Sequence, residues 1–195
     1  PAAFADITYG FYSVFAELNR VPYEIIPLRE DFTIAVEDYM GIHKNIFIAN
    51  PNAPTGIALA PCEIEKIVAS NPDNIVVVDE AYVDFGAESC IPLIRKYPNL
   101  LVTGTFSKSR SMAGARLGFG VGCRELIADL NTIKYSTNPY NINSMTMAAG
   151  IGVLEDEAYT RANCRTIEEN RAYTAEALKK LGFRMTDSKT NFLFA

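Results

Sequence analysis

Short apolar runs of strand length alternate along this chain with segments in which apolar residues recur at helical spacing. This alternation is typical of a sheet whose strands are joined by crossover helices. Residues 75–78 are all β-branched, which favours a strand that is buried on both faces, as in a parallel sheet. We therefore predict strands over residues 23–28, 45–49, 74–78, 100–105, 117–121 and 191–194.

Helices are predicted between these strands, at residues 10–20, 61–70, 88–96, 124–134, 144–154 and 156–181. Gly182 is a suitable residue to end the last helix, because glycine readily adopts the left-handed conformation that follows many helices. After Gly182 the strand pattern returns. We expect an α/β fold of three layers, α/β/α, around a mostly parallel sheet. Residues 1–182 would form one large domain, and residues 183–195 would begin a smaller one.

Composition excludes several classes of function. The 195 residues are 49% apolar and 21% charged, with a net charge of -5, which is a globular composition without a basic stripe for nucleic acid. The cysteines are scattered and His43 is the only histidine, so we expect no metal site. No apolar run reaches membrane-spanning length. We expect a cytoplasmic protein with reduced thiols.

Polar residues follow three of the predicted strands at the point where each strand ends. Asn-Pro-Asn-Ala-Pro-Thr-Gly occupies 50–56, Asp-Glu-Ala-Tyr occupies 79–82, and Gly-Thr-Phe-Ser-Lys occupies 104–108. Ligands of open α/β sheets bind outside the carboxyl ends of the strands. The three segments therefore predict one pocket that contains a carboxylate, a phenol, an amine and several hydroxyls.

These segments, with Arg116 eight residues after Lys108, resemble the signature set of fold-type I aminotransferases, which depend on pyridoxal phosphate (PLP). Longer stretches at 79–85, 105–109, 113–119 and 139–143 resemble the histidinol-phosphate aminotransferase family, and the resemblance runs along the whole chain. It implies a homodimer that exchanges an amino group between L-glutamate and imidazole-acetol phosphate, giving histidinol phosphate and 2-oxoglutarate in histidine biosynthesis.

The resemblance also assigns roles to three catalytic residues. Lys108 would form the Schiff base with PLP and later carry a proton between substrate and cofactor. Asp79 would pair with the protonated pyridine nitrogen, and Tyr82 would bind the phenolic oxygen. Read alone, such residues are more often a solvated lysine, a helix N-cap and a half-buried tyrosine. An aspartate directly after a buried strand is nevertheless unfavourable without a cationic partner, which favours the functional interpretation.

Further residues are assigned in the same way. Thr105, Ser107 and Arg116 would hold the phosphate, since hydroxyls donate to phosphate oxygens and guanidinium binds them as a fork. Tyr9 matches the aromatic residue that stacks on the pyridine ring, with core packing as the equal alternative. Asn191 matches an asparagine near the substrate carboxylate.

One position departs from the family pattern, in which an asparagine before the second proline bonds the phenolic oxygen of PLP. Here that residue is Ala53, which cannot donate. Either Tyr82 acts alone, or Asn52 or a water molecule substitutes. The family's phosphate-capping glycine loop and substrate-binding arginine are expected outside residues 1–195, so we expect this chain to be a fragment.

Other activities fit the same residues. A threonine-phosphate decarboxylase or an aromatic aminotransferase of similar sequence is the nearest alternative. An aminotransferase-like effector domain of a transcription regulator would require a DNA-binding domain before Pro1. A scaffold that has lost its cofactor is a third possibility, and the joint presence of Asp79, Tyr82, Lys108 and Arg116 argues against it.

Overall fold

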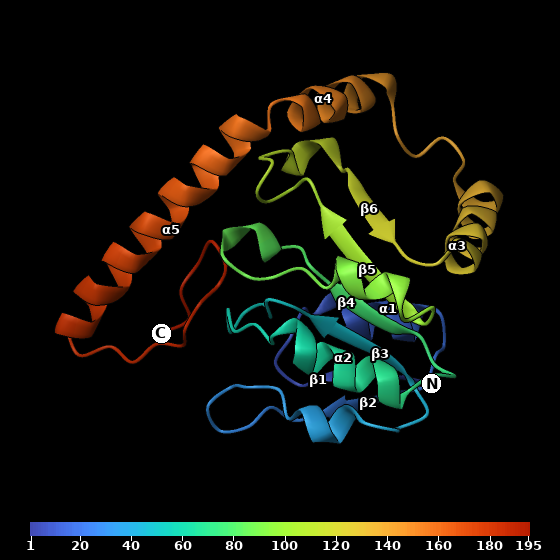
Figure 1. The fold of residues 1–195 in the computed structure, drawn as a ribbon, viewed down its shortest axis with the longest axis horizontal. Coiled ribbons are helices and arrows are strands. Elements are labelled where there is room, and N and C mark those ends of the chain that lie inside the picture. Colours follow the sequence, from blue (N-terminus) through green and yellow to red (C-terminus); the bar gives the residue numbers. More distant parts are fainter.

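A computed structural model describes all residues, 1–195. Its centre is one six-stranded sheet in the order β2-β1-β3-β4-β5-β6, and it confirms the predicted α/β fold (Figure 1). Neighbours among the first five strands run parallel, while β6 runs antiparallel to β5. The strands are β1 (Ala2–Ala5), β2 (Tyr23–Ile26), β3 (Asn45–Ala49), β4 (Val76–Asp79), β5 (Leu100–Thr105) and β6 (Gly118–Val121).

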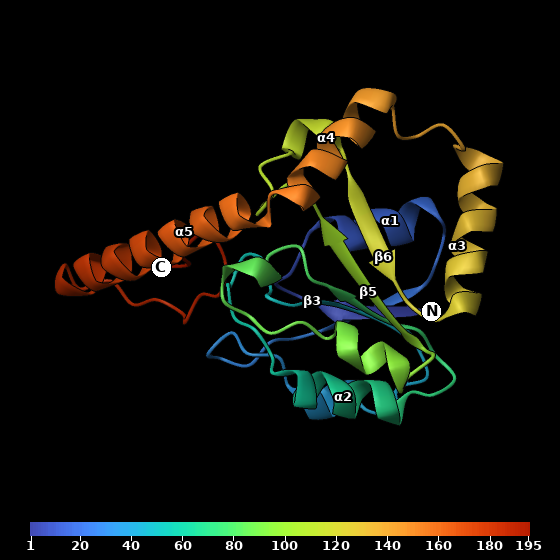
Figure 2. The ribbon, with the colours of Figure 1, turned by 45° about the horizontal axis from the view of Figure 1, so that its top comes forward.

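Helices α1 and α2 cover opposite faces of this sheet (Figure 2). Helix α2 (Pro61–Ser70) begins with proline in its first turn, and the Glu63 side chain accepts a bond from the Ala60 N–H at 3.1 Å. Its apolar face and alternate residues of the strands form the main core, in which Ile46, Ile48, Ile64, Ile67, Val68, Val76 and Val78 are fully buried or nearly so. Helix α1 (Phe11–Leu18) packs Tyr12 against Phe4 and Phe47 on the other face.

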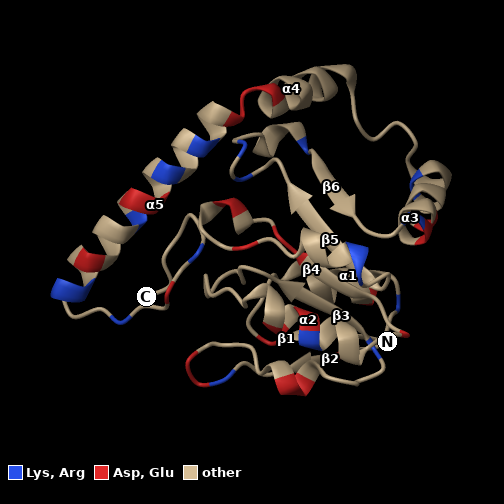
Figure 3. Cartoon of the chain, viewed as in Figure 1, with Lys and Arg blue, Asp and Glu red and all other residues tan.

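Three longer helices follow β6, namely α3 (Arg124–Thr137), α4 (Ser144–Glu155) and α5 (Glu157–Lys180). Helix α5 extends away from the sheet, and acidic and basic side chains are interspersed along it (Figure 3). The Asp156 side chain caps its first turn by accepting from the Tyr159 N–H at 3.1 Å. None of these helices has the combination of length and apolar sequence needed to cross a bilayer. Short 3-10 helices cover Val36–Tyr39, Val83–Phe85, Ile91–Arg95 and Ala113–Ala115.

Strand β1 was not predicted from the sequence. Its residues are Ala-Ala-Phe-Ala, a composition that lacks the β-branched and aromatic enrichment of most strands. All four residues are buried. Ala3 belongs to the main core on one face of the sheet, and Phe4 packs against Tyr12 and Tyr23 on the other, so tertiary packing overrides local preference here.

Two predicted elements are wrong. The helix expected over 88–96 is only the 3-10 turn Ile91–Arg95, because the buried Glu80 carboxylate accepts the Cys90 N–H at 2.5 Å and Pro92 lies at the start of the turn. Residues 191–194 do not form a strand. The Ser188 hydroxyl instead donates to the Phe192 carbonyl at 2.7 Å. This carbonyl therefore has a hydrogen-bond partner within the segment and does not pair with a sheet edge.

The C-terminal segment, residues 183–195, returns to the loop between β3 and α2. The Lys189 N–H donates to the Gly56 carbonyl at 2.8 Å, and the Thr186 hydroxyl donates to the Thr55 carbonyl at 2.5 Å. Gly56 has a φ of +74°, and a β-carbon on it would lie 2.5 Å from the Ser188 hydroxyl. The C-terminal segment therefore packs so closely on the backbone of Gly56 that a side chain larger than that of glycine has no room there.

We predict that Gly56→Ala destabilises the full-length protein by about 2–4 kcal/mol, because it adds overpacking to the left-handed strain. Gly182→Ala is the matched control. Gly182 also has a positive φ, +92°, but nothing lies near its β-position, so strain alone should cost about 1–2 kcal/mol. Urea unfolding of both variants measures the difference, and equal losses would show that the Ser188 contact is unimportant.

Candidate active site

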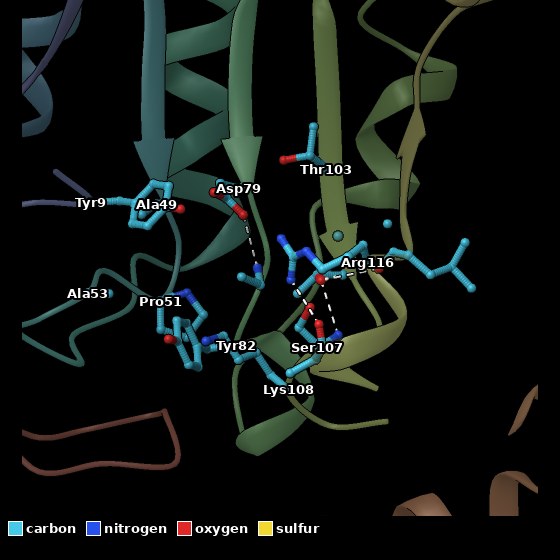
Figure 4. Close-up of a pocket in the computed structure, with 16 residues that line it drawn as sticks. Tyr9, Ala49, Pro51, Ala53, Asp79, Tyr82, Thr103, Ser107, Lys108 and Arg116 are labelled. Atoms are coloured by element: carbon cyan, nitrogen blue, oxygen red, sulfur yellow. Dashed lines mark hydrogen bonds between the residues drawn. The ribbon is translucent and has the colours of Figure 1, made fainter. Parts of the chain in front are cut away.

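A cavity of about 470 Å³ lies at the carboxyl ends of β3, β4 and β5. The loops that follow these strands form its walls, so segments more than fifty residues apart in sequence meet there, as expected for a parallel sheet. Figure 4 shows their side chains around one space. Most of the residues singled out from the sequence line it, namely Tyr9, Asp79, Tyr82, Thr105, Ser107, Lys108 and Arg116.

Asp79 ends β4 on the face of the sheet that α1 covers. Val76 and Val78 point into the core beneath α2, and the alternation of the strand turns Asp79 the other way. Its carboxylate accepts the Tyr12 hydroxyl at 3.1 Å and the Ala81 N–H at 3.2 Å. Burial raises the pKa of Asp79, and these two hydrogen bonds oppose that rise. Asp79 forms no ion pair with any lysine or arginine of the chain.

The amine of Lys108 and the ring of Tyr82 both line the cavity and lie close to each other. Lys108 follows β5 in a turn that the Ser111 N–H closes by donating to the Lys108 carbonyl at 3.1 Å. The Nζ atom of Lys108 is 5.2 Å from the centroid of the Tyr82 ring. The Phe192 ring packs edge-on against Tyr82, with centroids 5.2 Å apart. The C-terminal segment therefore buttresses one wall of the cavity.

A cluster of donors suited to an anion occupies one side of the cavity. The Thr105 hydroxyl donates to the Leu117 carbonyl at 3.3 Å and accepts the Ser107 N–H at 3.1 Å. Arg116 adopts a left-handed backbone conformation, with φ at +55°, and its guanidinium donates to the Ala113 carbonyl at 2.9 Å. This backbone turn directs the guanidinium toward Ser107 (Figure 4), and the remaining N–H groups are available to an anionic group.

Asn52, which the sequence offered as a cofactor contact, does not line the cavity, and its role toward the cofactor stays a prediction. The residue is buried, and its amide donates to the Ile7 carbonyl at 2.9 Å and the Thr55 hydroxyl at 3.0 Å. Its amide oxygen accepts the Thr8 hydroxyl at 2.7 Å. Asn52 thus fastens the chain beside Tyr9 to the loop after β3, and its hydrogen-bonding groups are used there. Asn191 is exposed and also lies outside the cavity lining.

Two residues with a place in the site were not singled out from the sequence. Tyr12 belongs to a helix that was predicted from its apolar face, and nothing local indicates that its hydroxyl reaches Asp79. Thr103 lines the cavity and pairs with Asp79 in the register of β4 and β5. Only the register of these two strands identifies Thr103, because its sequence context is that of an ordinary strand residue.

The residues present fit pyridoxal phosphate. Asp79 is a partly buried carboxylate without a cationic partner, and a protonated pyridine nitrogen would supply that partner. Lys108 offers an amine, and the Ser107 hydroxyl and the remaining Arg116 N–H groups offer donors for a phosphate; Thr105 joins them if its hydroxyl turns from the Leu117 carbonyl. Ala53 and Tyr82 both line the cavity, and of these two side chains only the phenol can donate a hydrogen bond.

Comparison with known proteins agrees with this geometry. The family model "Aminotransferase class I and II" matches residues 2–195. A histidinol-phosphate aminotransferase from Lactococcus lactis subsp. cremoris is 50% identical over 189 residues, which are 97% of this chain and 53% of that protein. The chain spans about half the length of the curated relatives it matches.

Two solved structures are similar over nearly the whole chain. A histidinol-phosphate aminotransferase from Clostridium acetobutylicum has a TM-score of 0.90 and 27% identity, and the match covers 98% of this chain and 60% of that one. One from Sinorhizobium meliloti, in complex with pyridoxal-5'-phosphate, has a TM-score of 0.86 and 21% identity, with 99% and 54% covered. The latter likeness shows the fold.

We predict that Asp79→Asn raises the melting temperature of the cofactor-free protein at neutral pH. Because the folded-state pKa of Asp79 is raised, wild type loses stability as pH rises above the unfolded value of about 3.9, while asparagine does not titrate. The advantage of the variant should therefore vanish near pH 4. Added PLP should stabilise wild type more than the variant. Melting curves across pH test this, and a variant that is less stable throughout would contradict it.

Proposed function

The chain belongs to the class I and II aminotransferase family, and from this membership we propose that its cavity holds pyridoxal phosphate covalently through Lys108. We propose further that the whole protein transfers an amino group from L-glutamate to imidazole-acetol phosphate, in histidine biosynthesis. The products are L-histidinol phosphate and 2-oxoglutarate. The observation that carries the proposal is the meeting of one amine, one carboxylate without a cation and one anion-binding cluster around a single cavity.

Each of these groups has a distinct task. PLP supplies an electron sink for the carbanion formed at the substrate. Asp79 keeps the pyridine nitrogen protonated, because an ionised carboxylate is stabilised by the adjacent cation and stabilises it in turn. Lys108 would hold the cofactor covalently, and its amine is the group that would move a proton at the substrate carbon. Tyr82 donates a hydrogen bond to the phenolic oxygen, a task it performs without help from Ala53.

The remaining lining residues bind and orient. Thr105, Ser107 and Arg116 hold the phosphate, which fixes the ring relative to Lys108. Tyr9 is 46% exposed and stands at the cavity wall, where its ring covers one face of the pyridine. Its edge contact with Tyr12, at a centroid distance of 5.5 Å, limits its movement. A ring held in this way would help to orient the cofactor.

The same relatives support proposals about the localisation, assembly and substrate of the whole protein. We propose a cytoplasmic homodimer whose smaller domain begins near residue 183, with Asn191 close to the substrate carboxylate. Support for histidinol phosphate as substrate comes from relatives that bear that name at about half identity. Threonine phosphate and aromatic amino acids are the alternative substrates, because the cavity described here recognises the cofactor and not the substrate side chain.

We predict that borohydride reduction of the PLP-loaded, full-length protein attaches the cofactor to Lys108. Peptide mapping identifies the labelled lysine, and Lys108→Ala should abolish the label while still binding PLP reversibly. Label on another lysine would overturn the site assignment.

The same preparation should convert histidinol phosphate with 2-oxoglutarate at least about a hundredfold faster, in kcat/KM, than phenylalanine or threonine phosphate, since a lost buried polar contact costs at least that much. A preference for either of these would retain the cofactor site but refute the substrate.

A further inference from the structure

The hydroxyl of Tyr12, a residue outside the cavity lining, donates a hydrogen bond to Asp79. Resting on the proposed function, we propose that Tyr12 is a positioning residue, which fixes the orientation of the Asp79 carboxylate toward the pyridine nitrogen and keeps it ionised. Tyr12 does not line the cavity itself. It therefore acts on the cofactor only through Asp79.

The carboxylate of Asp79 is held at both oxygens. Tyr12 donates to Oδ2 at 3.1 Å, and the Ala81 N–H donates to Oδ1 at 3.2 Å. Rotation of the carboxylate would break both hydrogen bonds, so its plane is fixed relative to β4 and α1. Tyr12 is the only side chain that forms a hydrogen bond with Asp79. Removal of this hydroxyl would leave the backbone of Ala81 as the single constraint.

The chemical state of Tyr12 suits this task. Its ring is buried, with 9% exposed. Burial, together with the charge of Asp79, raises the pKa of the Tyr12 phenol far above the physiological range. Tyr12 is therefore a neutral donor at every working pH. A hydrogen bond donated to a carboxylate favours its ionised form, and this effect opposes the burial that raises the pKa of Asp79.

Aromatic packing holds Tyr12 in place. Its ring contacts Phe4 and Phe47, with centroids 5.9 and 5.8 Å away, and meets Tyr9 edge-on at 5.5 Å. The Tyr12 N–H also donates to the Tyr9 carbonyl at 3.1 Å, in the turn that opens α1. Tyr12 thus contacts both Tyr9, which is proposed to stack on the pyridine ring, and Asp79, which is proposed to pair with the pyridine nitrogen.

The other ionisable groups that face Asp79 come from the cavity walls. They are Tyr9 before α1, Tyr82 after β4, Lys108 after β5 and Arg116 before β6, and β3 contributes none. All of them remain in a Tyr12→Phe variant. A change in the pH dependence of that variant therefore reports on the missing hydroxyl.

The test measures the PLP dissociation constant of the full-length protein as a function of pH, for wild type, Tyr12→Phe and Tyr23→Phe. Tyr23 is the matched control, since its hydroxyl donates to the exposed Glu17 at 3.0 Å and its ring stacks on Phe4. At neutral pH, Tyr12→Phe should bind PLP about tenfold more weakly, because hydrogen bonds to charged groups have this magnitude. The pH below which binding is lost should move upward. Tyr23→Phe should match wild type in both.

A merely structural role would lower the melting temperature of Tyr12→Phe but leave the pH profile of PLP binding unchanged, and that outcome overturns the proposal. Difluorotyrosine at position 12 provides a second variant, which keeps the ring and the hydroxyl if Tyr12→Phe fails to fold. Fluorination makes the phenol a stronger donor, so binding should persist to lower pH than in wild type. An unchanged or opposite shift refutes the proposal.

A third comparison separates this inference from the proposed function. In an Asp79→Asn background, Tyr12→Phe should change PLP affinity by less than about twofold, since the partner of the hydroxyl has been neutralised. A full tenfold loss in that background would show that Tyr12 acts by another route. Wild-type protein that takes no borohydride label at Lys108 would instead refute the proposed function. A label at Lys108 with normal affinity in Tyr12→Phe would refute only the role of Tyr12.

Discussion

The site depends on one unfavourable placement, the carboxylate of Asp79 at the end of a buried strand with no cation beside it. A carboxylate that is desolvated without a partner is destabilising, and burial accordingly raises the pKa of Asp79. Tyr12 and the Ala81 N–H compensate only partly, because both donors are neutral. We propose that this placement is a preformed position for a cationic nitrogen. Such a position supports catalysis by PLP, in which the ring nitrogen must hold its proton while the ring accepts electrons.

Glu80, the next residue, shows how strand geometry separates two adjacent carboxylates. Successive side chains leave a strand on opposite faces, so Glu80 turns away from the cavity and toward the core beneath α2. There it is buried and accepts the Ser89 hydroxyl at 2.6 Å and the Cys90 N–H at 2.5 Å. These bonds hold the loop after β4, and Glu80 does not line the cavity. Asp79 does line it, and each of its oxygens accepts only one hydrogen bond, so lone pairs remain for a ligand. Glu80 thus serves the fold that positions Asp79.

Much of this arrangement could be predicted from the sequence, because parallel strands bring their carboxyl ends to one edge. The polar segments after β3, β4 and β5 are visible in the sequence, and Asp79, Tyr82 and Lys108 line one cavity as expected. The bounds of α2 were predicted to the residue, since Pro61 and the Asn-Pro pair at 71–72 mark its ends. Confident inference was possible where a local chemical signal and the topology agreed.

The remaining features depend on contacts between distant residues. Asn52 follows β3, as the cavity residues Pro51 and Ala53 do, yet its amide forms hydrogen bonds with Thr8 and Thr55, which no local pattern indicates. The role of Tyr12 depends on a bond across 67 positions, which no local pattern reveals. Strand β1 forms from three alanines and Phe4 because both faces of the sheet are covered at this point. In each case the residue has several possible partners, and only the assembled fold selects one.

The most direct test of the central claim is the nitrogen-15 chemical shift of the pyridine nitrogen, measured for ring-labelled PLP bound to the full-length protein. The account predicts a protonated nitrogen at neutral pH in wild type, and loss of that proton in Asp79→Asn. A nitrogen that is already neutral in wild type, or one that stays protonated after the substitution, would contradict the pairing with Asp79 on which the site is built.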